Sequence, residues 1–145
     1  MIRPFLDANV LVTVLNKEYP GFTDSARVLS LAGKKGIQLY TSPLCLAIAW
    51  YFAGKKSGEK LAAEKARLLM ENLSLAGVGE EEVRQCLADK KVRDLEDGME
   101  YYAAKNAGCT HLITFDTGDF HFAAMPVCTP EAFLREIIGR KDLFS

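Results

Sequence analysis

The sequence predicts an α/β fold, a three-layer α/β/α sandwich built around a central parallel sheet. The composition and the order of its segments lead to this prediction. Short apolar segments that read as strands alternate along the chain with longer segments of helical spacing. Short apolar strands in such an alternation are typical of a parallel sheet that helices cover on both faces.

The expected elements follow one another with regular boundaries. An apolar run over residues 9–15 leads from the first strand into a helix, and Ser42 with Pro43 marks a helix start. We expect strands over residues 2–6, 37–41, 73–78, 111–115 and 125–128. We expect further helices from Thr23 to Lys35, from Pro43 to Ala53 with Gly54 ending it, from Ser57 or Gly58 onward, from Glu80, from Asp94 to Gly108, and from Ala132 to Ile138 with Thr129 as cap. In the helix that Asp94 begins, one face is expected to carry Met99, Tyr102, Ala103 and Ala107.

The size and composition limit the class of protein. At 145 residues, with no repeat, low-complexity tract or linker, the chain is expected to form a single domain over residues 1–145. A net charge of −1 argues against a strongly basic nucleic-acid-binding protein, although one local basic patch could still meet a nucleic acid. The chain has no apolar run of about 18 residues and no signal-peptide pattern, so we expect a cytoplasmic protein with no membrane span.

The cysteines and histidines do not suggest a zinc site. Four cysteines are scattered without a C-x-x-C pair, and they are expected to be reduced and mostly buried. The two histidines lie far apart in the sequence, and His111, at a strand start, is interpreted as structural.

Acidic residues follow two of the expected strands and begin one helix. Asp7 ends the first strand, Asp116 and Asp119 follow a later one, and Asp94 and Asp97 open the helix that leads into that later strand. The carboxyl ends of parallel strands meet at one edge of the sheet, so these carboxylates should gather there. Such a cluster favours Mg²⁺ or Mn²⁺ and the hydrolysis of a phosphodiester. Taken singly, some of these acids have a structural alternative, since Asp94 is also a good helix N-cap and Asp119 a good turn residue. Asp7 is harder to explain in this way, because the end of an apolar strand is a poor site for an unpartnered charge.

At these residues the chain resembles the PIN-domain family, in particular the small ribonucleases that serve as toxins in VapBC-type toxin–antitoxin pairs. The resemblance covers essentially the whole length. It rests on Phe5-Leu6-Asp7-Ala8-Asn9-Val10-Leu11, Asp94-Leu95-Glu96-Asp97, Leu112-Ile113-Thr114-Phe115-Asp116-Thr117-Gly118-Asp119-Phe120 and the closing segment from Pro126 to Leu134. It implies a PIN-like fold and cleavage of RNA that depends on Mg²⁺ or Mn²⁺, with an antitoxin protein as a further partner.

Carried over by position, the resemblance also implies roles for individual residues. Asp7, Asp97 and Asp116 look like the metal ligands, and the same three with Asp119 look like the catalytic acids. The supporting residues that it implies are Asn9, Asp94 and Thr114.

One departure from the family pattern leaves an alternative open. Such nucleases usually carry a Glu in the helix after the second strand, and here that position falls at about Ile48 or Ala49. A catalytically degenerate PIN domain that binds RNA or a protein partner without cleavage is therefore the alternative function. An Asp at the end of the first strand also fits a phosphatase of the haloacid-dehalogenase type, but Asn9 stands where that chemistry needs a second Asp.

Two further segments allow both a functional and a structural interpretation. Residues 53–70 carry five Lys and Arg against two Glu, which indicates either a track for the RNA backbone or a solvated helix. The aromatic run Trp50-Tyr51-Phe52 indicates either core packing or a surface for a homodimer or another partner.

Overall fold

A computed structural model of the chain describes residues 1–140 and contains a five-stranded sheet in which all strands are parallel. The strand order is β3-β2-β1-β4-β5. The predicted fold class is confirmed, and each strand lies inside a predicted segment. The strands are Pro4–Leu6 (β1), Tyr40–Thr41 (β2), Ser74–Leu75 (β3), His111–Ile113 (β4) and Val127–Cys128 (β5).

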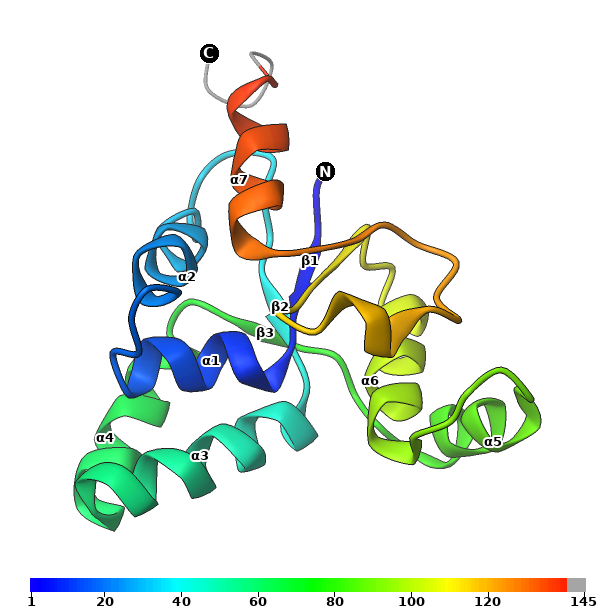
Figure 1. Cartoon of the computed structure of the whole chain (residues 1–145), viewed down its shortest axis with the longest axis horizontal. Helices are drawn as coiled ribbons and strands as arrows, with labels where there is room; N and C mark the ends of the chain where they lie inside the picture. The colour runs from blue at the N-terminus through cyan, green and yellow to red at the C-terminus, as the bar shows by residue number, and fades with distance from the viewer. Residues whose placement is uncertain (141–145) are drawn as a thin grey trace.

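Helices form the outer layers of the fold. Figure 1 shows α1, α2 and α7 on one side of the strands and α5 and α6 on the other, with α3 packed below α1 and α4 packed against α3. Within residues 1–140, no helix combines the length and the apolar character needed to cross a membrane. The helices are Ala8–Leu15 (α1), Phe22–Leu29 (α2), Pro43–Ser57 (α3), Glu59–Met70 (α4), Glu80–Ala88 (α5), Leu95–Asn106 (α6) and Pro130–Ile138 (α7), with a 3₁₀ turn over Thr117–Phe120 (η1).

The central strands β1 and β4 position the site. Every residue of both strands is buried, as expected for strands with a helical layer on each face. The chain runs outward from β1 to β2 and β3 on one side and then crosses to β4 and β5 on the other side of β1, so the direction of the strand order reverses between β1 and β4. Ligand sites in open parallel sheets lie beyond the carboxyl ends of the strands at such a reversal, which here means just after Leu6 and Ile113.

Two predicted helix ends were wrong. Helix α3 continues through Gly54 and ends at Gly58, whose φ of +87° suits the left-handed conformation that glycine adopts without strain. Helix α2 ends at Leu29 rather than Lys35, because the chain turns over the next residues and Gly33 has a φ of +83°. Its N-cap is Gly21, and Thr23 lies inside the helix.

Two lysines of the basic segment have structural partners. The Lys65 ammonium donates a hydrogen bond to the Leu15 carbonyl oxygen at 2.6 Å, and the Lys56 ammonium donates to the carbonyl oxygen of Asn16. These carbonyl groups lie at the C-terminal end of α1 and have no N–H donor within the helix. The partial negative charge at this end of the helix attracts cations. Lys56 and Lys65 therefore attach α3 and α4 to α1, which supports the structural interpretation for this part of residues 53–70.

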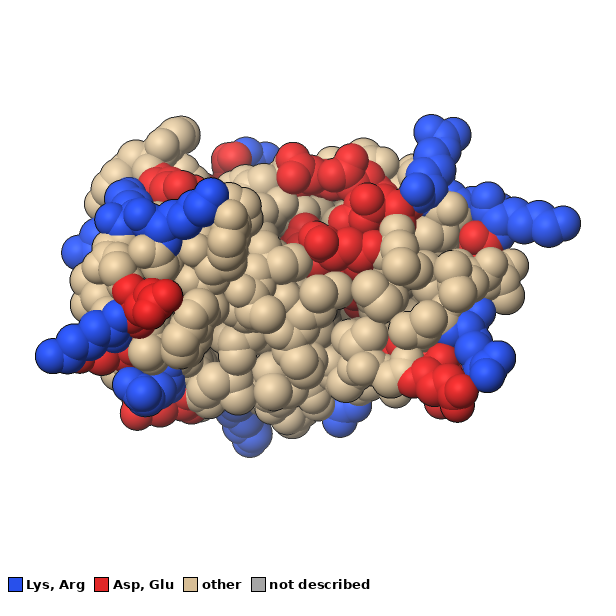
Figure 2. Space-filling model, turned by 90° about the horizontal axis from the view of Figure 1, so that it is seen from below, with Lys and Arg blue, Asp and Glu red and all other residues tan. Residues whose placement is uncertain are grey.

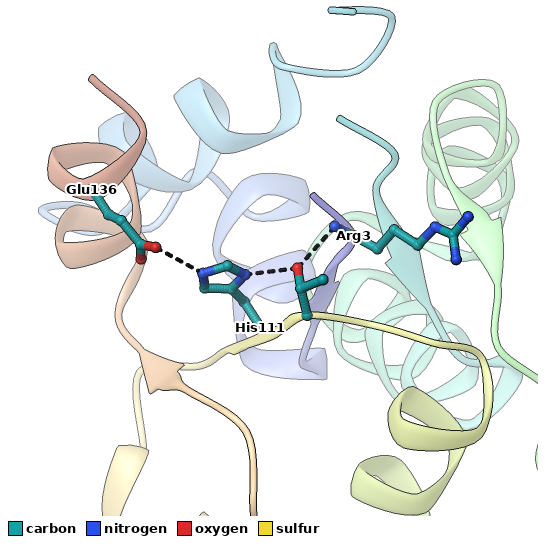
Figure 3. Close-up of polar contacts among 4 residues, drawn as sticks. Arg3, His111 and Glu136 are labelled. Carbon is teal, nitrogen blue, oxygen red and sulfur yellow. Dashed lines mark hydrogen bonds and ion pairs between the residues drawn. The ribbon is translucent and has the colours of Figure 1, made fainter. Parts of the chain in front are cut away.

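His111 connects β4 to α7, as its structural interpretation requires. Its Nε2 atom lies 3.1 Å from Glu136 Oε1, and its Nδ1 atom lies 2.8 Å from the Thr110 hydroxyl oxygen. That hydroxyl oxygen also accepts a hydrogen bond from the Arg3 backbone N–H at 2.9 Å (Figure 3). The four cysteines are free thiols, three of them buried, as predicted.

Candidate active site

Acidic side chains from separate parts of the chain surround one cavity beyond the carboxyl ends of β1 and β4. The cavity has a volume of about 700 Å³, and among the described residues that line it there is no lysine, arginine or histidine. Figure 2 shows acidic side chains gathered in a hollow of this face, with Lys and Arg placed mainly toward its edges. The acids that line the cavity are Asp7, Glu18, Asp94, Glu96, Asp97, Asp116 and Asp119.

Asp7 lies at the junction of β1 and α1. Its backbone N–H donates to the Ile113 carbonyl oxygen of β4 at 3.0 Å, and its side chain caps α1 by accepting from the Ala8 N–H at 2.6 Å. The side chain is only 7% exposed. The N-terminal end of a helix stabilises a carboxylate, so the sequence Leu6-Asp7-Ala8 both ends the strand and holds a negative charge at the cavity.

The Thr114 hydroxyl joins the ends of the two central strands. It donates to Asp7 Oδ2 at 2.8 Å and accepts from the Asn9 side-chain amide at 3.0 Å and from the Asp116 backbone N–H at 3.1 Å. The Asn9 amide also reaches Asp116 Oδ2 at 3.2 Å. Asn9 and Thr114, two of the residues predicted to support the site, therefore connect Asp7 to Asp116.

We expect Thr114→Val to lower the free energy of unfolding by about 1–3 kcal/mol, because it leaves buried polar groups without their shared partner. Urea denaturation followed by circular dichroism measures the change. Thr117→Val, the same substitution at an exposed position three residues later, should leave the free energy of unfolding nearly unchanged. Equal values for both variants would show that the Thr114 hydroxyl does not hold the two strand ends together.

The first turn of α6 adds a second group of acids to the cavity. Asp94 is the N-cap of α6, as its structural interpretation had it, and accepts a hydrogen bond from the Asp97 backbone N–H at 3.0 Å. Burial, and then the neighbouring charges of Asp94, Asp7 and Asp119, raise the pKa of Asp97 to about 7. The pKa of Glu96 is raised for similar reasons. Negative charges held this close repel one another, and a divalent cation would relieve the repulsion.

The remaining acids come from the turn after β4. Asp116 precedes η1 and Asp119 lies within it, with the Asp119 N–H donating to the Asp116 carbonyl oxygen at 3.0 Å. Both side chains are exposed and line the cavity. The structure thus brings all of the sequence-predicted acids to one cavity: Asp7, Asp94, Asp97, Asp116 and Asp119.

The wall that α3 contributes is apolar. Ile48 and Phe52 line the cavity, whereas Ala49 is fully buried in the core. Of the two positions predicted for the missing acid, Ile48 is therefore the one that faces the cavity.

Sequence reasoning missed Glu18, which lines the cavity, and also missed Glu100 of α6. The Glu100 side chain is fully buried, and neither carboxylate oxygen has a hydrogen-bond partner. One carboxylate oxygen each from Glu100 and Asp7 and the sulfur of Cys45 lie within 4.8 Å of one another. Burial, and then contact with the Asp7 carboxylate, raise the pKa of Glu100 to about 11.

The face predicted for α6 explains the omission of Glu100. The buried residues of α6 are Gly98, Glu100, Tyr101, Ala103 and Ala104, whereas of the face predicted for this helix only Ala103 is buried, and Tyr102 and Ala107 are partly buried against the core. The spacing of the acids could have indicated Glu100. It follows Asp97 by three residues, so both side chains lie on the same side of the helix.

The residues present fit a divalent cation. Mg²⁺ and Mn²⁺ prefer carboxylate oxygens, which this cavity supplies from β1, α6 and the turn after β4. The buried carboxylate of Glu100 is also without the partner that a buried polar group requires.

Comparisons with known proteins agree with this geometry. A family model described as the PIN domain matches residues 3–118. Ribonuclease VapC1 of Aquifex aeolicus (strain VF5) is 26% identical over 135 residues, which are 90% of this chain and 92% of that protein.

Solved structures share the fold. The toxin VapC20 of Mycobacterium tuberculosis, described as cleaving the sarcin–ricin loop, matches with a TM-score of 0.66 and 16% identity over 84% of this chain and 95% of that one. A toxin–antitoxin complex from Klebsiella pneumoniae matches with a TM-score of 0.67 and 18% identity over 88% of this chain and 97% of that one. At these identities the likeness shows a common architecture.

Proposed function

This chain belongs to the PIN domain family, and from that premise we propose that it is a metal-dependent endoribonuclease that acts as the toxin of a toxin–antitoxin pair. The observation that carries the proposal is the cavity itself. Acids from four separate segments line it, and no cationic side chain among the described lining residues balances them. The Aquifex aeolicus relative is named a ribonuclease and aligns with 90% of this chain. Its name supports the same chemistry.

In this proposal, Asp7, Asp97 and Asp116 hold a Mg²⁺ or Mn²⁺ ion, and Asp119 is a further catalytic acid. Asn9, Asp94 and Thr114 support these residues through the hydrogen bonds described above. When bound, the ion would supply charge neutralisation at the phosphate and activation of a water molecule.

The chain's own residues account for the orientation of the acids. The Thr114 hydroxyl and the Ala8 N–H fix the two oxygens of Asp7, and the Asp94 side chain fixes the first turn of α6. The open, exposed positions of Asp116 and Asp119 leave room for an extended RNA strand at the mouth of the cavity. Such a substrate implies a cytoplasmic site of action.

We further propose a protein antitoxin as a partner, since one of the solved structures with this fold is a toxin–antitoxin complex. Trp50, Tyr51 and Phe52 are exposed on α3 and offer an apolar surface for that partner or for a homodimer.

We expect Asp7→Asn and Asp116→Asn each to reduce the cleavage of single-stranded RNA by more than about 100-fold, since the loss of a residue that merely supports a metal ligand already costs 10- to 100-fold. Cleavage is measured on gels with Mg²⁺ or Mn²⁺, and EDTA should abolish it in the unmodified protein. Asp24→Asn, on α2 and outside the cavity, serves as the control and should retain cleavage. Cleavage in EDTA, or equal rates for the Asp7 variant and the unmodified protein, would contradict the proposal.

The apolar side chain at Ile48 favours a second candidate, a PIN domain that binds RNA or a protein without cleaving. This candidate predicts RNA binding by the unmodified protein with no metal-dependent cleavage. The same assays therefore separate the two functions.

A further inference from the structure

We propose that Glu100 is a ligand of the divalent ion and takes the place of the acid that α3 lacks. This inference rests on the proposed function, since it concerns the same metal site. Helix α3 presents Ile48 where an acid is expected, and α6 provides a carboxylate against Asp7. The ion would thus have as many acids available as in a site with an acid on α3, but one of them would come from α6.

The position of Glu100 supports this role. It lies one helical turn after Asp97, so α6 directs two acids toward the same region. Asp7 connects the two parts of the site, because it lines the cavity and its carboxylate also belongs to the cluster with Glu100 and Cys45. An ion held by Asp7 at the inner end of the cavity would therefore also be close to Glu100.

The absence of partners around Glu100 points to a ligand. Its carboxylate is fully buried, and both oxygens lack a hydrogen-bond partner. A carboxylate in that situation stays ionised in proteins only when it is paired or binds a metal ion, and otherwise it takes up a proton. Within residues 1–140, no Lys or Arg forms an ion pair with it.

A structural role makes a different prediction from a ligand role. A neutral Glu100 could serve only to donate a hydrogen bond to Asp7, and glutamine has a similar size and can donate the same bond. Glu100→Gln would then leave metal binding intact. If Glu100 is a ligand, the amide is a poor substitute for the carboxylate that a hard cation prefers.

The test measures Mn²⁺ binding to the full chain by isothermal titration calorimetry. We expect Glu100→Gln to weaken Mn²⁺ affinity by at least about tenfold, on the scale known for residues around a metal site. Restoring the acid on α3 should compensate, so Glu100→Gln combined with Ile48→Glu should regain most of the lost affinity. Glu81→Gln removes the same charge from an exposed position on α5 and should bind Mn²⁺ like the unmodified protein.

Folding of each variant is checked by circular dichroism in EDTA. If the buried amide prevents folding, Glu100→Met removes the carboxylate without adding a polar group, and the same loss of Mn²⁺ affinity is expected. Unchanged affinity in a folded Glu100 variant would overturn the inference, and so would a loss that Ile48→Glu fails to compensate.

The controls separate this inference from the proposed function. If the unmodified protein binds no Mn²⁺, both fail. If the unmodified protein binds Mn²⁺, Asp7→Asn abolishes binding and Glu100→Gln does not change it, the proposed metal site stands and only the role of Glu100 is overturned.

Discussion

In EDTA, the free energy of unfolding is expected to fall as the pH rises from 6 to 8, with Glu100 contributing up to about 1.4 kcal/mol per pH unit. The native carboxyl keeps its proton because its pKa is raised to about 11, whereas in the unfolded chain it ionises near its usual value of 4.5. The native state then binds one more proton than the unfolded state between these two values. The contribution of Glu100 to the free energy of unfolding is fully present below pH 4.5, the pKa in the unfolded chain. It is lost as the pH rises toward about 11, the pKa in the folded protein.

Most of the groups that face Glu100 raise its pKa. Burial has the largest effect, and the nearby Asp7 carboxylate at the start of α1 adds to it. Asp97 on the same helix raises the pKa further. Cys45 on α3 lowers it by a smaller amount. The net effect keeps Glu100 neutral when no cation is present.

Urea denaturation at pH 6, 7 and 8 measures this dependence. Glu100→Gln should reduce the loss of stability per pH unit by up to about 1.4 kcal/mol, because glutamine does not titrate. Glu81→Gln, at an exposed position, should retain the dependence of the unmodified protein. Identical pH dependence in the unmodified protein and Glu100→Gln would show that Glu100 is already ionised in the metal-free fold.

Gly98→Ala is expected to destabilise the protein by about 1–3 kcal/mol or more, the usual cost of overpacking a core. A Cβ atom at this position would lie 2.3 Å from the Cys86 sulfur and 2.6 Å from Val92 Cγ1. Replacing a helical glycine by alanine ordinarily gains at most about 1 kcal/mol, so the steric cost exceeds the gain. Because Gly98 follows Asp97 directly, the displacement should also weaken Mn²⁺ binding.

Thermal and urea denaturation measure this effect, and α3 offers a matched control. Gly54 also lies within a helix, but nothing lies within 4 Å of the Cβ that alanine would add, so Gly54→Ala should stabilise by about 0.5–1 kcal/mol. Combining Gly98→Ala with Cys86→Ala and Val92→Ala removes both close contacts and should relieve the clash. A Gly98→Ala variant as stable as the unmodified protein would contradict the close packing of α5 against α6.

The sequence predicted much of the candidate site because strand ends are local signals. Asp7 directly follows β1 and Asp116 follows β4 by three residues, and parallel strands bring their carboxyl ends to one edge whatever the details of packing. Glu100 could not be found in this way, because its burial depends on how α6 is rotated. The packed face of α6 carries Gly98, Glu100 and alanines, so hydrophobic spacing does not mark it.

The helix ends show the same limit. Gly54 and Gly58 are equivalent as sequence signals, and only the backbone conformation distinguishes them, since Gly58 has a positive φ and Gly54 continues the helix. Ile48 and Ala49 were likewise equivalent until the orientation of α3 showed which of them faces the cavity.

Helix α1 is held at both ends, by the Asp7 side chain at its start and by Lys56 and Lys65 at its finish. Its eight residues form a stiff rod about 12 Å long. The two lysines belong to the helical hairpin that also carries the exposed aromatic run on α3. A displacement of α3 and α4 would therefore be transmitted along α1 to the Asp7 side chain.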